Sequence, residues 1–422
     1  MKRRPLSMKK SSGIAAIVLA SATVAACGAS ASSGSGGAAG AGGSGGTILI
    51  GSVHPLTGAL AGAGGLMNDG AKLAVADINA AGGIKSLGGA KLKLDEGDSQ
   101  GVAATGQSEA QRLIQDGAVA LVGTYQSDVT QNVAAVSERS KVPLVIDVAV
   151  DNQILQQGYK YTFRIQPNAT EMGTAGADSL AAMGQQNGTP IKSVSYIHIE
   201  GSFGQSVFDA FKKEAQAKGI SVVKEITYAG TSFTDATTQV KEAASANPDV
   251  IVDTGYYPDS LLVAKSVQAL KPNIKALFGI ANGAFDDGSF PGDAGPAGKN
   301  VLSANYHYSA TSKRVTDIRQ RFEKQFGKPM ETASVLSYQA VEVVAQALEQ
   351  AKSKDPAKLR DAIAGLSLSD PLLAFSGPIK FDQTGQNENA TVIVMQVQNG
   401  KVEQVFPKQF QTAPLVFPAF TK

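Results

Sequence analysis

Short apolar runs alternate with longer segments of helical periodicity along most of the chain from Thr47 onward. The run "TILIGSV" at residues 47–53 predicts a short buried strand. Residues 64–84 then repeat apolar side chains at helical intervals, and Gly82 and Gly83 predict the end of that helix. The alternation continues through strand 91–99, helix 102–116, strand 118–124, helix 129–140, strand 143–147 and strand 161–165.

A second series of alternating elements follows the first. It comprises helix 170–187, strand "SVSYIHI", helix 204–218, strand "SVVKEITY", helix 234–246, strand "DVIVDTG", helix 258–270 and strand "KALFGI". Repeated strand–helix alternation predicts an α/β fold with parallel sheets covered on both faces. A chain of 422 residues is too long for one typical core, so we expect two doubly wound lobes. A closed barrel of eight strand–helix units is the alternative that the same periodicity allows.

Ligands of open α/β sheets bind beyond the carboxyl ends of the strands, so the loops at those ends are candidate binding segments. Most of these loops are rich in Gly, Ser, Tyr, Asp and Asn; they span residues 53–65, 123–130, 147–152, 198–204, 255–259 and 279–284. None holds a phosphate loop, a His/Cys metal set or a Ser-His-Asp order, so we expect no enzyme, no metal and no cofactor. His54, His198 and His307 are scattered over separate elements, which is typical of structural histidines.

The first 27 residues form a different kind of segment. A basic start, "MKRRPLSMKK", precedes an apolar stretch of 14 residues, "GIAAIVLASATVAA". That stretch is shorter than the roughly 20 residues that span a bilayer, but it suits a signal peptide. It ends in Val24-Ala25-Ala26-Cys27, which resembles the lipobox of bacterial lipoproteins. The resemblance implies cleavage before Cys27 and lipidation of its thiol; a cysteine after an ordinary signal peptide is the alternative.

Residues 27–46 are rich in glycine and serine, which predicts a flexible tether between a lipidated Cys27 and the folded body. Five positive charges lie in the first ten residues, and their removal from the formal net charge of +2 leaves −3. A slightly acidic body without tryptophan offers no electrostatic footprint for nucleic acid. Since Cys27 is the only cysteine, no internal disulfide can form.

Three segments carry a resemblance to the branched-chain amino-acid (Leu/Ile/Val-type) substrate-binding lipoproteins of ABC transporters. Residues 51–84, "GSVHPLTGALAGAGGLMNDGAKLAVADINAAGGI", are similar to the opening of that family. Residues 250–270, "VIVDTGYYPDSLLVAKSVQAL", and 375–386, "FSGPIKFDQTGQ", are similar to two later segments. The resemblance implies a type I periplasmic-binding fold, with two lobes joined by three crossover strands and a ligand cleft between them.

The resemblance also implies domain boundaries. Residues 1–26 are expected to be the signal peptide and 27–46 the tether. Lobe I is expected to comprise residues 47–165 and 306–378, and lobe II residues 166–305 and 379–422. The three crossings are expected near residues 164–166, 303–307 and 377–381.

In lobe I, the family resemblance points to two strand-end loops as the ligand site. In the loop Tyr125-Gln126-Ser127, Ser127 matches the family serine that holds a ligand carboxylate, although it also lies near the start of a helix that Asp128 is expected to cap. The next loop contains Ala149 and Asp151, where the family usually has a small residue and a threonine. Asp151 therefore either binds an ammonium or amide group or caps a turn.

In lobe II, Tyr256 matches the family tyrosine that packs on the ligand. The alternative is that one of Tyr256 and Tyr257 lies in the core and the other at the surface. Phe203 lies where the family often has an aromatic residue at the cleft mouth, with a packing role equally open. The family's amino-acid binders carry a glutamate after the strand at 276–280, whereas this chain has Asn282 and no acid before Asp286. Amides, urea-like compounds, small carboxylates and aromatic acids are therefore alternatives to a branched-chain amino acid.

The function that the resemblance implies is capture of a small polar solute outside the cytoplasm by a lipid-anchored, monomeric protein. Closure of the lobes on the solute would be read by an ABC permease and its ATPase subunits. A ligand-sensing receptor subunit of the same fold is the alternative.

If Cys27 is the lipidation site, replacing it should remove the lipid. We expect cells fed a radioactive lipid precursor to label the natural chain and not Cys27→Ala, as judged by autoradiography of the purified proteins. Label that persists in Cys27→Ala would contradict the proposed anchor.

Overall fold

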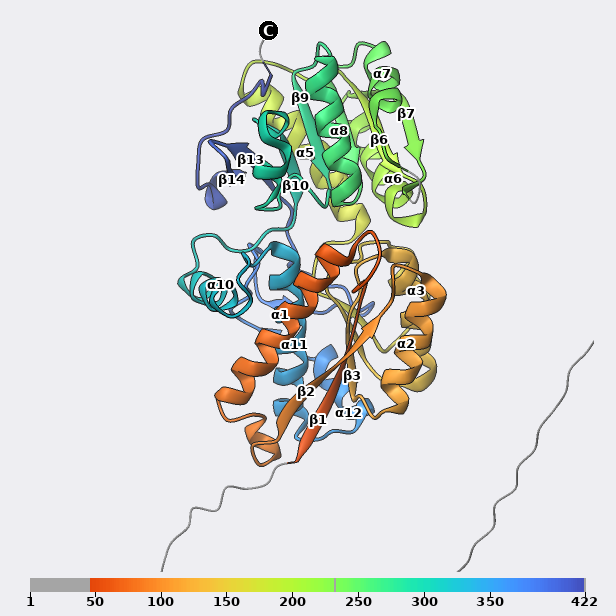
Figure 1. The fold of residues 1–422 in the computed structure, drawn as a ribbon, viewed down its shortest axis with the longest axis vertical. Helices are drawn as coiled ribbons and strands as arrows, with labels where there is room; N and C mark the ends of the chain where they lie inside the picture. The colour runs from red at the N-terminus through yellow and green to blue at the C-terminus, as the bar shows by residue number, and fades with distance from the viewer. Residues whose placement is uncertain (1–45, 231–232, 421–422) are drawn as a thin grey trace, which may run out of the picture. The chain divides into compact units, whose positions relative to one another are not determined.

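Two open β-sheets covered by helices form the part of the chain that the structure describes, residues 46–230 and 233–420 (Figure 1). In this computed structural model, the first sheet has five strands in the order β2-β1-β3-β4-β5. This sheet and the helices that cover it are called lobe I. The second sheet, in lobe II, has seven strands in the order β14-β13-β10-β9-β8-β6-β7. Two open sheets confirm the expected α/β fold with two lobes and exclude the closed barrel.

The strands follow the predicted alternation closely as far as β9. The strands are β1 (Thr47–His54), β2 (Lys91–Asp98), β3 (Ala120–Gly123), β4 (Leu144–Ile146), β5 (Thr162–Arg164), β6 (Ser193–Ile199), β7 (Ser221–Tyr228), β8 (Val250–Thr254), β9 (Ala276–Ile280), β10 (Leu302–Asn305), β11 (Ser367–Leu368), β12 (Ile379–Lys380), β13 (Ile393–Gln398) and β14 (Lys401–Phe406). The helices are α1 (Ala61–Ala80), α2 (Ala103–Gln115), α3 (Ser127–Ser140), α4 (Gln153–Gln156), α5 (Ala169–Gln186), α6 (Ser202–Ala217), α7 (Thr237–Ser245), α8 (Tyr257–Leu270), α9 (Phe290–Ala294), α10 (Lys313–Phe326), α11 (Thr332–Ala351) and α12 (Pro356–Ala364).

Lobe I is a parallel sheet that buries both of its faces. Helices α1 and α11 cover one face, and α2 and α3 cover the other (Figure 1). Strand β3 shows the two-residue period behind this arrangement, because Ala120 and Val122 pack in the core beneath α1 and α11. Leu121, between them, packs in the separate core beneath α2 and α3. A strand buried on both faces has to be apolar throughout, which is why its sequence shows a continuous apolar run.

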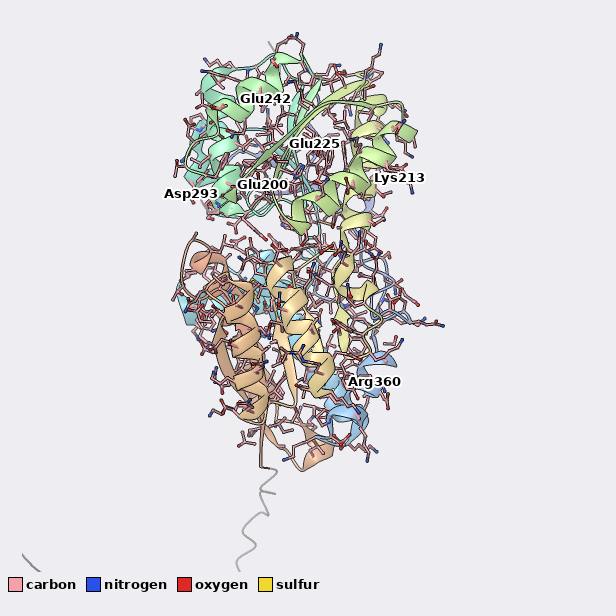
Figure 2. The ribbon with its side chains drawn as sticks, turned by 90° about the vertical axis from the view of Figure 1, so that its right-hand side faces the viewer. Glu200, Lys213, Glu225, Glu242, Asp293 and Arg360 are labelled. Atoms are coloured by element: carbon pink, nitrogen blue, oxygen red, sulfur yellow. The ribbon has the colours of Figure 1, made fainter. Side chains whose placement is uncertain are left out.

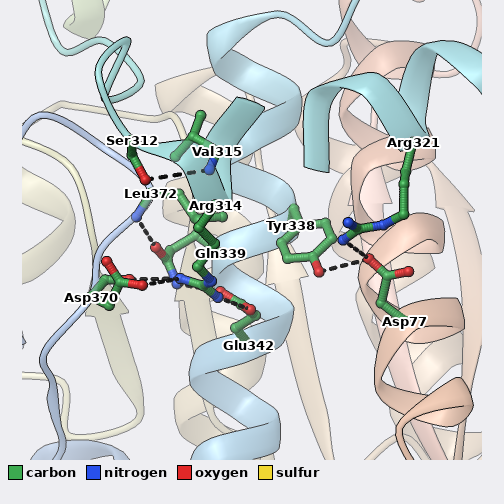
Figure 3. Close-up of polar contacts among 10 residues, drawn as sticks. All are labelled: Asp77, Ser312, Arg314, Val315, Arg321, Tyr338, Gln339, Glu342, Asp370 and Leu372. Atoms are coloured by element: carbon green, nitrogen blue, oxygen red, sulfur yellow. Dashed lines mark hydrogen bonds and ion pairs between the residues drawn. The ribbon is translucent and has the colours of Figure 1, made fainter. Parts of the chain in front are cut away.

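Helices α10 and α11 come late in the chain and yet belong to lobe I, where polar contacts secure them (Figure 3). The Tyr338 hydroxyl on α11 donates to Asp77 on α1 at 2.9 Å, and Arg321 on α10 meets the same carboxylate at 2.8 Å. Arg314 on α10 also pairs with Glu342 on α11. These contacts join the first helix of the lobe to elements that follow it by more than two hundred residues.

Lobe II differs from the expected all-parallel sheet at one edge. Strand β10 is parallel to β9 but antiparallel to β13, which in turn is antiparallel to β14. The turn between β13 and β14 is Asn399-Gly400, and both residues have positive φ, 50° and 75°. An Asn-Gly pair of this kind closes a two-residue hairpin, and a hairpin can join only antiparallel strands.

The chain crosses between the lobes three times, as expected, but the third crossing comes later than the sequence indicated. Residues 377–381 had been expected to cross; instead Ile379 and Lys380 pair with β11, which follows the lobe I helix α12. A tight turn at Asp382, whose carboxylate accepts from the Thr384 N–H, reverses the chain first. The crossing then occupies residues 385–392, where the Gly385 carbonyl accepts from the Arg164 N–H at 2.8 Å.

Helices α1 and α11 approach each other most closely at Gly70. A Cβ atom at Gly70 would lie 2.2 Å from the Ser334 carbonyl oxygen of α11, a separation that backbone atoms cannot accommodate without moving. Gly65, on the same helix, has open space where its Cβ would be. The contact of the two helices, which forms much of the core of lobe I, therefore depends on the absence of a side chain at residue 70.

Gly70→Ala should lower the free energy of unfolding by about 1–3 kcal/mol, because the added methyl group forces the two helices apart. Gly65→Ala is the matched control, and it should leave stability unchanged or raise it by up to about 1 kcal/mol, since alanine favours the helix. Urea denaturation followed by circular dichroism measures both. Equal stability of the two variants would contradict this account of the helix contact.

Candidate functional site

A cavity of ≈ 410 Å³ lies where the strand-end loops of the two lobes meet. All six loops singled out from the sequence contribute to it, together with the first turns of α1 and the start of α11. Lobe I lines it with Ala59, Leu60, Gly62, Ala63, Leu66, Tyr125, Ser127, Val148, Ala149, Val150, Lys328, Glu331, Thr332 and Ala333. Lobe II and the second crossing line it with Phe203, Gly255, Tyr256, Tyr257, Pro258, Ala281, Asn282, Gly283, Asp286, Asp287, Ser289, Asn305 and Tyr306.

Three aromatic side chains contact one another at the boundary between the lobes. Tyr125 follows β3 in lobe I, and its ring centroid lies 5.2 Å from that of Tyr256, which follows β8 in lobe II. Phe203, on α6, stacks on the other side of Tyr256 at 5.3 Å. Burial raises the pKa of both tyrosines above its usual value, so the phenols are neutral. Such rings offer a solute an apolar face together with a hydroxyl that can form hydrogen bonds.

Ser127 is the first residue of α3, and it lines the cavity. The sequence had indicated a helix from Val129 capped by Asp128; the helix instead starts at Ser127, with Gln126 at the N-cap position and no side-chain cap. The Ser127 hydroxyl oxygen accepts from the Asp151 N–H at 3.3 Å, which leaves its proton free to donate. The uncapped N–H groups of the first turn and the helix dipole both favour a negative charge here.

Gln126 and Asp151 do not line the cavity, in contrast to their prediction as ligand-binding residues. The Gln126 side chain donates to the Gly101 carbonyl at 3.1 Å. The Asp151 carboxylate is fully buried and accepts from Gln131 at 2.6 Å and from Ser206 at 2.8 Å. Because Ser206 lies on α6, Asp151 joins the two lobes, and it also accepts from the backbone of its own turn. The structure places this side chain in its own turn and at a contact between the lobes, and a role in ligand binding stays a prediction.

Asn282 lines the cavity, but its side-chain amide is fully engaged within lobe II. Its nitrogen donates to Asp253 at 2.6 Å and to Ser260 at 2.8 Å, and its oxygen accepts from the N–H groups of Ala284 and Phe285. The amide therefore shapes the loop after β9 and has little left to offer a solute. Asn282 therefore positions the segment that follows it, which includes Asp286 and Asp287.

Three carboxylates in the cavity wall were not predicted from the sequence: Asp286, Asp287 and Glu331. Asp286 accepts from Ser303 at 2.8 Å, and burial raises its pKa to about 7. Glu331 comes from lobe I. One of its carboxylate oxygens accepts from the N–H of Gly288 in lobe II at 2.8 Å, and the other oxygen has no hydrogen-bond partner. Burial, and then repulsion by Asp287, raises the pKa of Glu331 to about 7. The Asp-Asp pair was visible in the sequence, but nothing there placed Glu331 beside it.

The three histidines all lie outside the cavity lining. His54 bridges Ser52 at 2.9 Å and Asp147 at 2.8 Å, a hydroxyl–imidazole–carboxylate order like that of hydrolases. Every member is at most 1% exposed, and Ser52 donates to Asn68, so no solute reaches this hydroxyl. Burial lowers the pKa of His307 to about 3, which makes it a neutral structural group.

Within residues 46–230 and 233–420, no group of His, Cys, Asp and Glu side chains is arranged to hold a metal ion. The helices of the same residues include none with the length and apolar character needed to span a membrane. Cys27 and the expected tether up to residue 45 lie outside the described residues.

Comparison with known proteins agrees with the geometry of the two lobes. A family model described as periplasmic binding protein matches residues 47–401. The Leu/Ile/Val-binding protein homolog 8 of Brucella abortus (strain 2308) is 30% identical over 384 residues, which cover 88% of this chain and 93% of that protein.

Two solved structures share the fold. The branched-chain amino acid transporter substrate binding protein LivJ from Streptococcus pneumoniae, in complex with isoleucine, has a TM-score of 0.73 at 22% identity, covering 88% of this chain and 100% of its own. A solute-binding protein of an ABC transporter from R. palustris, in complex with benzoate, has a TM-score of 0.75 at 21% identity, covering 88% of this chain and 97% of its own. With its two sheets, its crossings and the family match over nearly all described residues, this chain belongs to the periplasmic binding protein family.

Proposed function

We propose that this protein is the extracytoplasmic solute-binding protein of an ABC importer and that it captures a small amino acid between its lobes. The observation that carries the proposal is the polarity of the cavity. The lining offers hydrogen-bond donors at the start of α3, and it offers carboxylates after β9 and before α11. A solute with both a carboxylate and an ammonium group complements the donors and the carboxylates.

The donor groups suit the carboxylate of the solute. Ser127 can donate its hydroxyl proton, and the first N–H groups of α3 have no partner within the helix. Helix N-termini stabilise anions through these donors and the helix dipole together. Ala149 and Val150 line the wall nearby with small and apolar side chains.

The acidic groups suit the ammonium. Asp286 and Glu331 are buried carboxylates whose pKa values are both raised to about 7, because burial, and then repulsion by Asp287, disfavours their charged forms. A cation placed beside these carboxylates would favour their charged forms and lower their pKa values. Benzoate, the ligand of the R. palustris protein, would bring a further negative charge and lacks the cation that these groups favour.

The size and lining of the cavity indicate the rest of the solute. A volume of ≈ 410 Å³ accommodates a small molecule of amino-acid size. Leu60, Leu66 and Val148 contribute aliphatic surface, and Tyr125 and Tyr256 contribute aromatic surface. This lining favours an apolar side chain, aliphatic or aromatic, and leaves amides, urea-like compounds and simple carboxylates as weaker candidates.

Contacts between the lobes beside the cavity support a mechanism of capture by closure. The Ser202 hydroxyl, at the first turn of α6 in lobe II, donates to Asp128 of lobe I at 2.7 Å. The Ser206 hydroxyl, one turn later, donates to Asp151 of lobe I at 2.8 Å. Together with the contact between the tilted rings of Tyr125 and Tyr256, they form a set of contacts that separation of the lobes would break. Hinge motion between such states is a common way to enclose a ligand.

The remaining parts of the proposal come from the sequence. A lipidated Cys27 and the Gly/Ser-rich tether would hold a monomer at the membrane surface, where the permease and its ATPase subunits receive the solute. A sensing subunit of the same fold would capture its ligand through the same cavity.

Titration calorimetry with leucine, isoleucine, valine and phenylalanine tests the site. We expect at least one to bind, and Ser127→Ala to weaken it about tenfold through loss of a hydrogen bond to a charged group. Tyr256→Ala should also weaken it about tenfold or more, because the ring contributes both area and stacking. Ser108→Ala, at an exposed serine of α2, is the matched control and should bind normally. Unchanged affinity in both cavity variants would contradict the assignment of the site.

The affinity for an amino acid should depend on pH. The pKa of Asp286 is about 7 without solute, and an ammonium beside it lowers that pKa, so binding releases a proton between the two values. Affinity should therefore rise about tenfold from pH 6 to pH 8 for one titrating carboxyl and level off above it. Asp286→Asn should reduce the rise to the part due to Glu331, and Asp286→Asn combined with Glu331→Gln should flatten the profile. Affinity that falls with rising pH would instead indicate a solute carboxylate beside the acidic groups.

A further inference from the structure

A second pocket, of ≈ 280 Å³, lies within lobe I and shares no lining residue with the cavity between the lobes. Three segments line it: residues 159–163 at the start of β5, the helix α12, and the turn at residues 381–385. Figure 2 labels Arg360, the residue that α12 contributes together with Ala364. The volume is near the lower end of the roughly 300–1,000 Å³ that small-molecule pockets enclose.

Two buried polar atoms at this pocket have no hydrogen-bond partner among the described residues. One is the Oγ1 of Thr162, a residue that is 1% exposed, and the other is the Nε of Arg360. Leaving such a group without a partner costs about 1–3 kcal/mol, and native structures contain few of them. A hydroxyl and a guanidinium N–H can both donate, so each of the two atoms would pair with an acceptor oxygen of a guest.

The charges around the pocket favour an anion. Lys160 lines it, and its ammonium forms no ion pair with any residue that the structure describes. Arg360 has one ion pair, at 3.0 Å to the exposed Asp361, which leaves other donors of the guanidinium available. Asp382 is the acidic lining residue, and one of its oxygens accepts from two backbone N–H groups of its own turn. The lining therefore holds two cations and one carboxylate, and one oxygen of that carboxylate is already engaged.

The remainder of the lining is apolar and aromatic. Phe163 and Phe381 form the floor, with ring centroids 5.3 Å apart and an angle of 60° between the rings. Tyr159 adds a third ring. We propose that this pocket binds a small carboxylate with a planar apolar body, whose oxygens face Arg360 and Thr162 and whose body rests against the aromatic rings. Guanidinium groups recognise the planar carboxylate through paired hydrogen bonds.

This proposal is independent of the solute captured between the lobes. The turn that forms one wall is tightly placed, since a Cβ atom at Gly385 would lie 2.3 Å from the Thr162 carbonyl oxygen. The pocket is therefore built from fixed backbone rather than from exposed side chains alone. A carboxylate bound here would occupy lobe I whether the cavity between the lobes is empty or filled.

The probe is 4-fluorobenzoate, titrated to about 10 mM into the full isotopically labelled chain. We expect saturable amide shifts at Gly385 and Ala364, the backbone nearest the pocket, together with broadening of the fluorine signal. The same shifts should appear in Tyr256→Ala, whose substitution disturbs only the cavity between the lobes. The uncharged isostere 4-fluorobenzamide should bind about tenfold more weakly, because it lacks the charge that the cations favour.

Three variants separate the pocket from general effects on the fold. Arg360→Gln and Lys160→Gln each remove one cation and should each weaken 4-fluorobenzoate several-fold, with about tenfold expected for Arg360→Gln. Thr162→Val keeps the shape and removes the unpaired hydroxyl, so it should weaken binding without loss of melting temperature. Lys358→Gln, on the same helix but outside the pocket lining, is the control and should bind normally. Absence of saturable shifts at Gly385 and Ala364, or shifts that survive unchanged in all three variants, would overturn the proposal.

Discussion

The buried guanidinium of Arg164 is the interaction on which the junction of the two lobes depends. It is 1% exposed, and it donates to the Gln386 side chain at 2.8 Å and to the Asp151 carbonyl at 2.8 Å. Burial lowers its pKa to about 10, and a buried charge of this kind is tolerated only when hydrogen bonds replace water. Because Gln386 lies on the third crossing and Asp151 in a loop beside the cavity, one side chain positions the hinge and the site together.

The placement of the donor groups in the cavity is a consequence of this arrangement. The loop that Arg164 holds presents the Asp151 N–H to the Ser127 hydroxyl, which fixes the serine at the first turn of α3 with its proton left over. The Asp151 carboxylate, turned away from the cavity, reaches Ser206 of the opposite lobe. Backbone groups and buried side chains thus prepare the site before any solute is present, which lowers the cost of ordering it on binding.

Strand–helix alternation was enough to predict both sheets as far as β9 and the strand-end loops that line the cavity, since residues that follow parallel strands meet at one edge. Within those loops, the family resemblance pointed to Tyr125, Ser127 and Tyr256. The hairpin edge of lobe II and the later third crossing depended on turns, which periodicity does not report. The sequence also could not predict which polar side chains are available to a solute. The amide of Asn282 is hydrogen-bonded within lobe II, and Glu331 reaches the cavity from the start of α11. Both outcomes are set by tertiary contacts rather than by local pattern.

The placement of the carboxylates gives closure a physical cause under the proposed function. Asp286 and Asp287 belong to lobe II, whereas Glu331 belongs to lobe I, and repulsion between Asp287 and Glu331 raises the pKa of the latter. Without a cation between them, these groups oppose the approach of the lobes whenever they are ionised. A solute ammonium converts the same repulsion into attraction on both sides, and its contact with both lobes exists only when they are close. The solute therefore binds the closed arrangement more tightly than the open one, which is the condition for a ligand to shift that equilibrium.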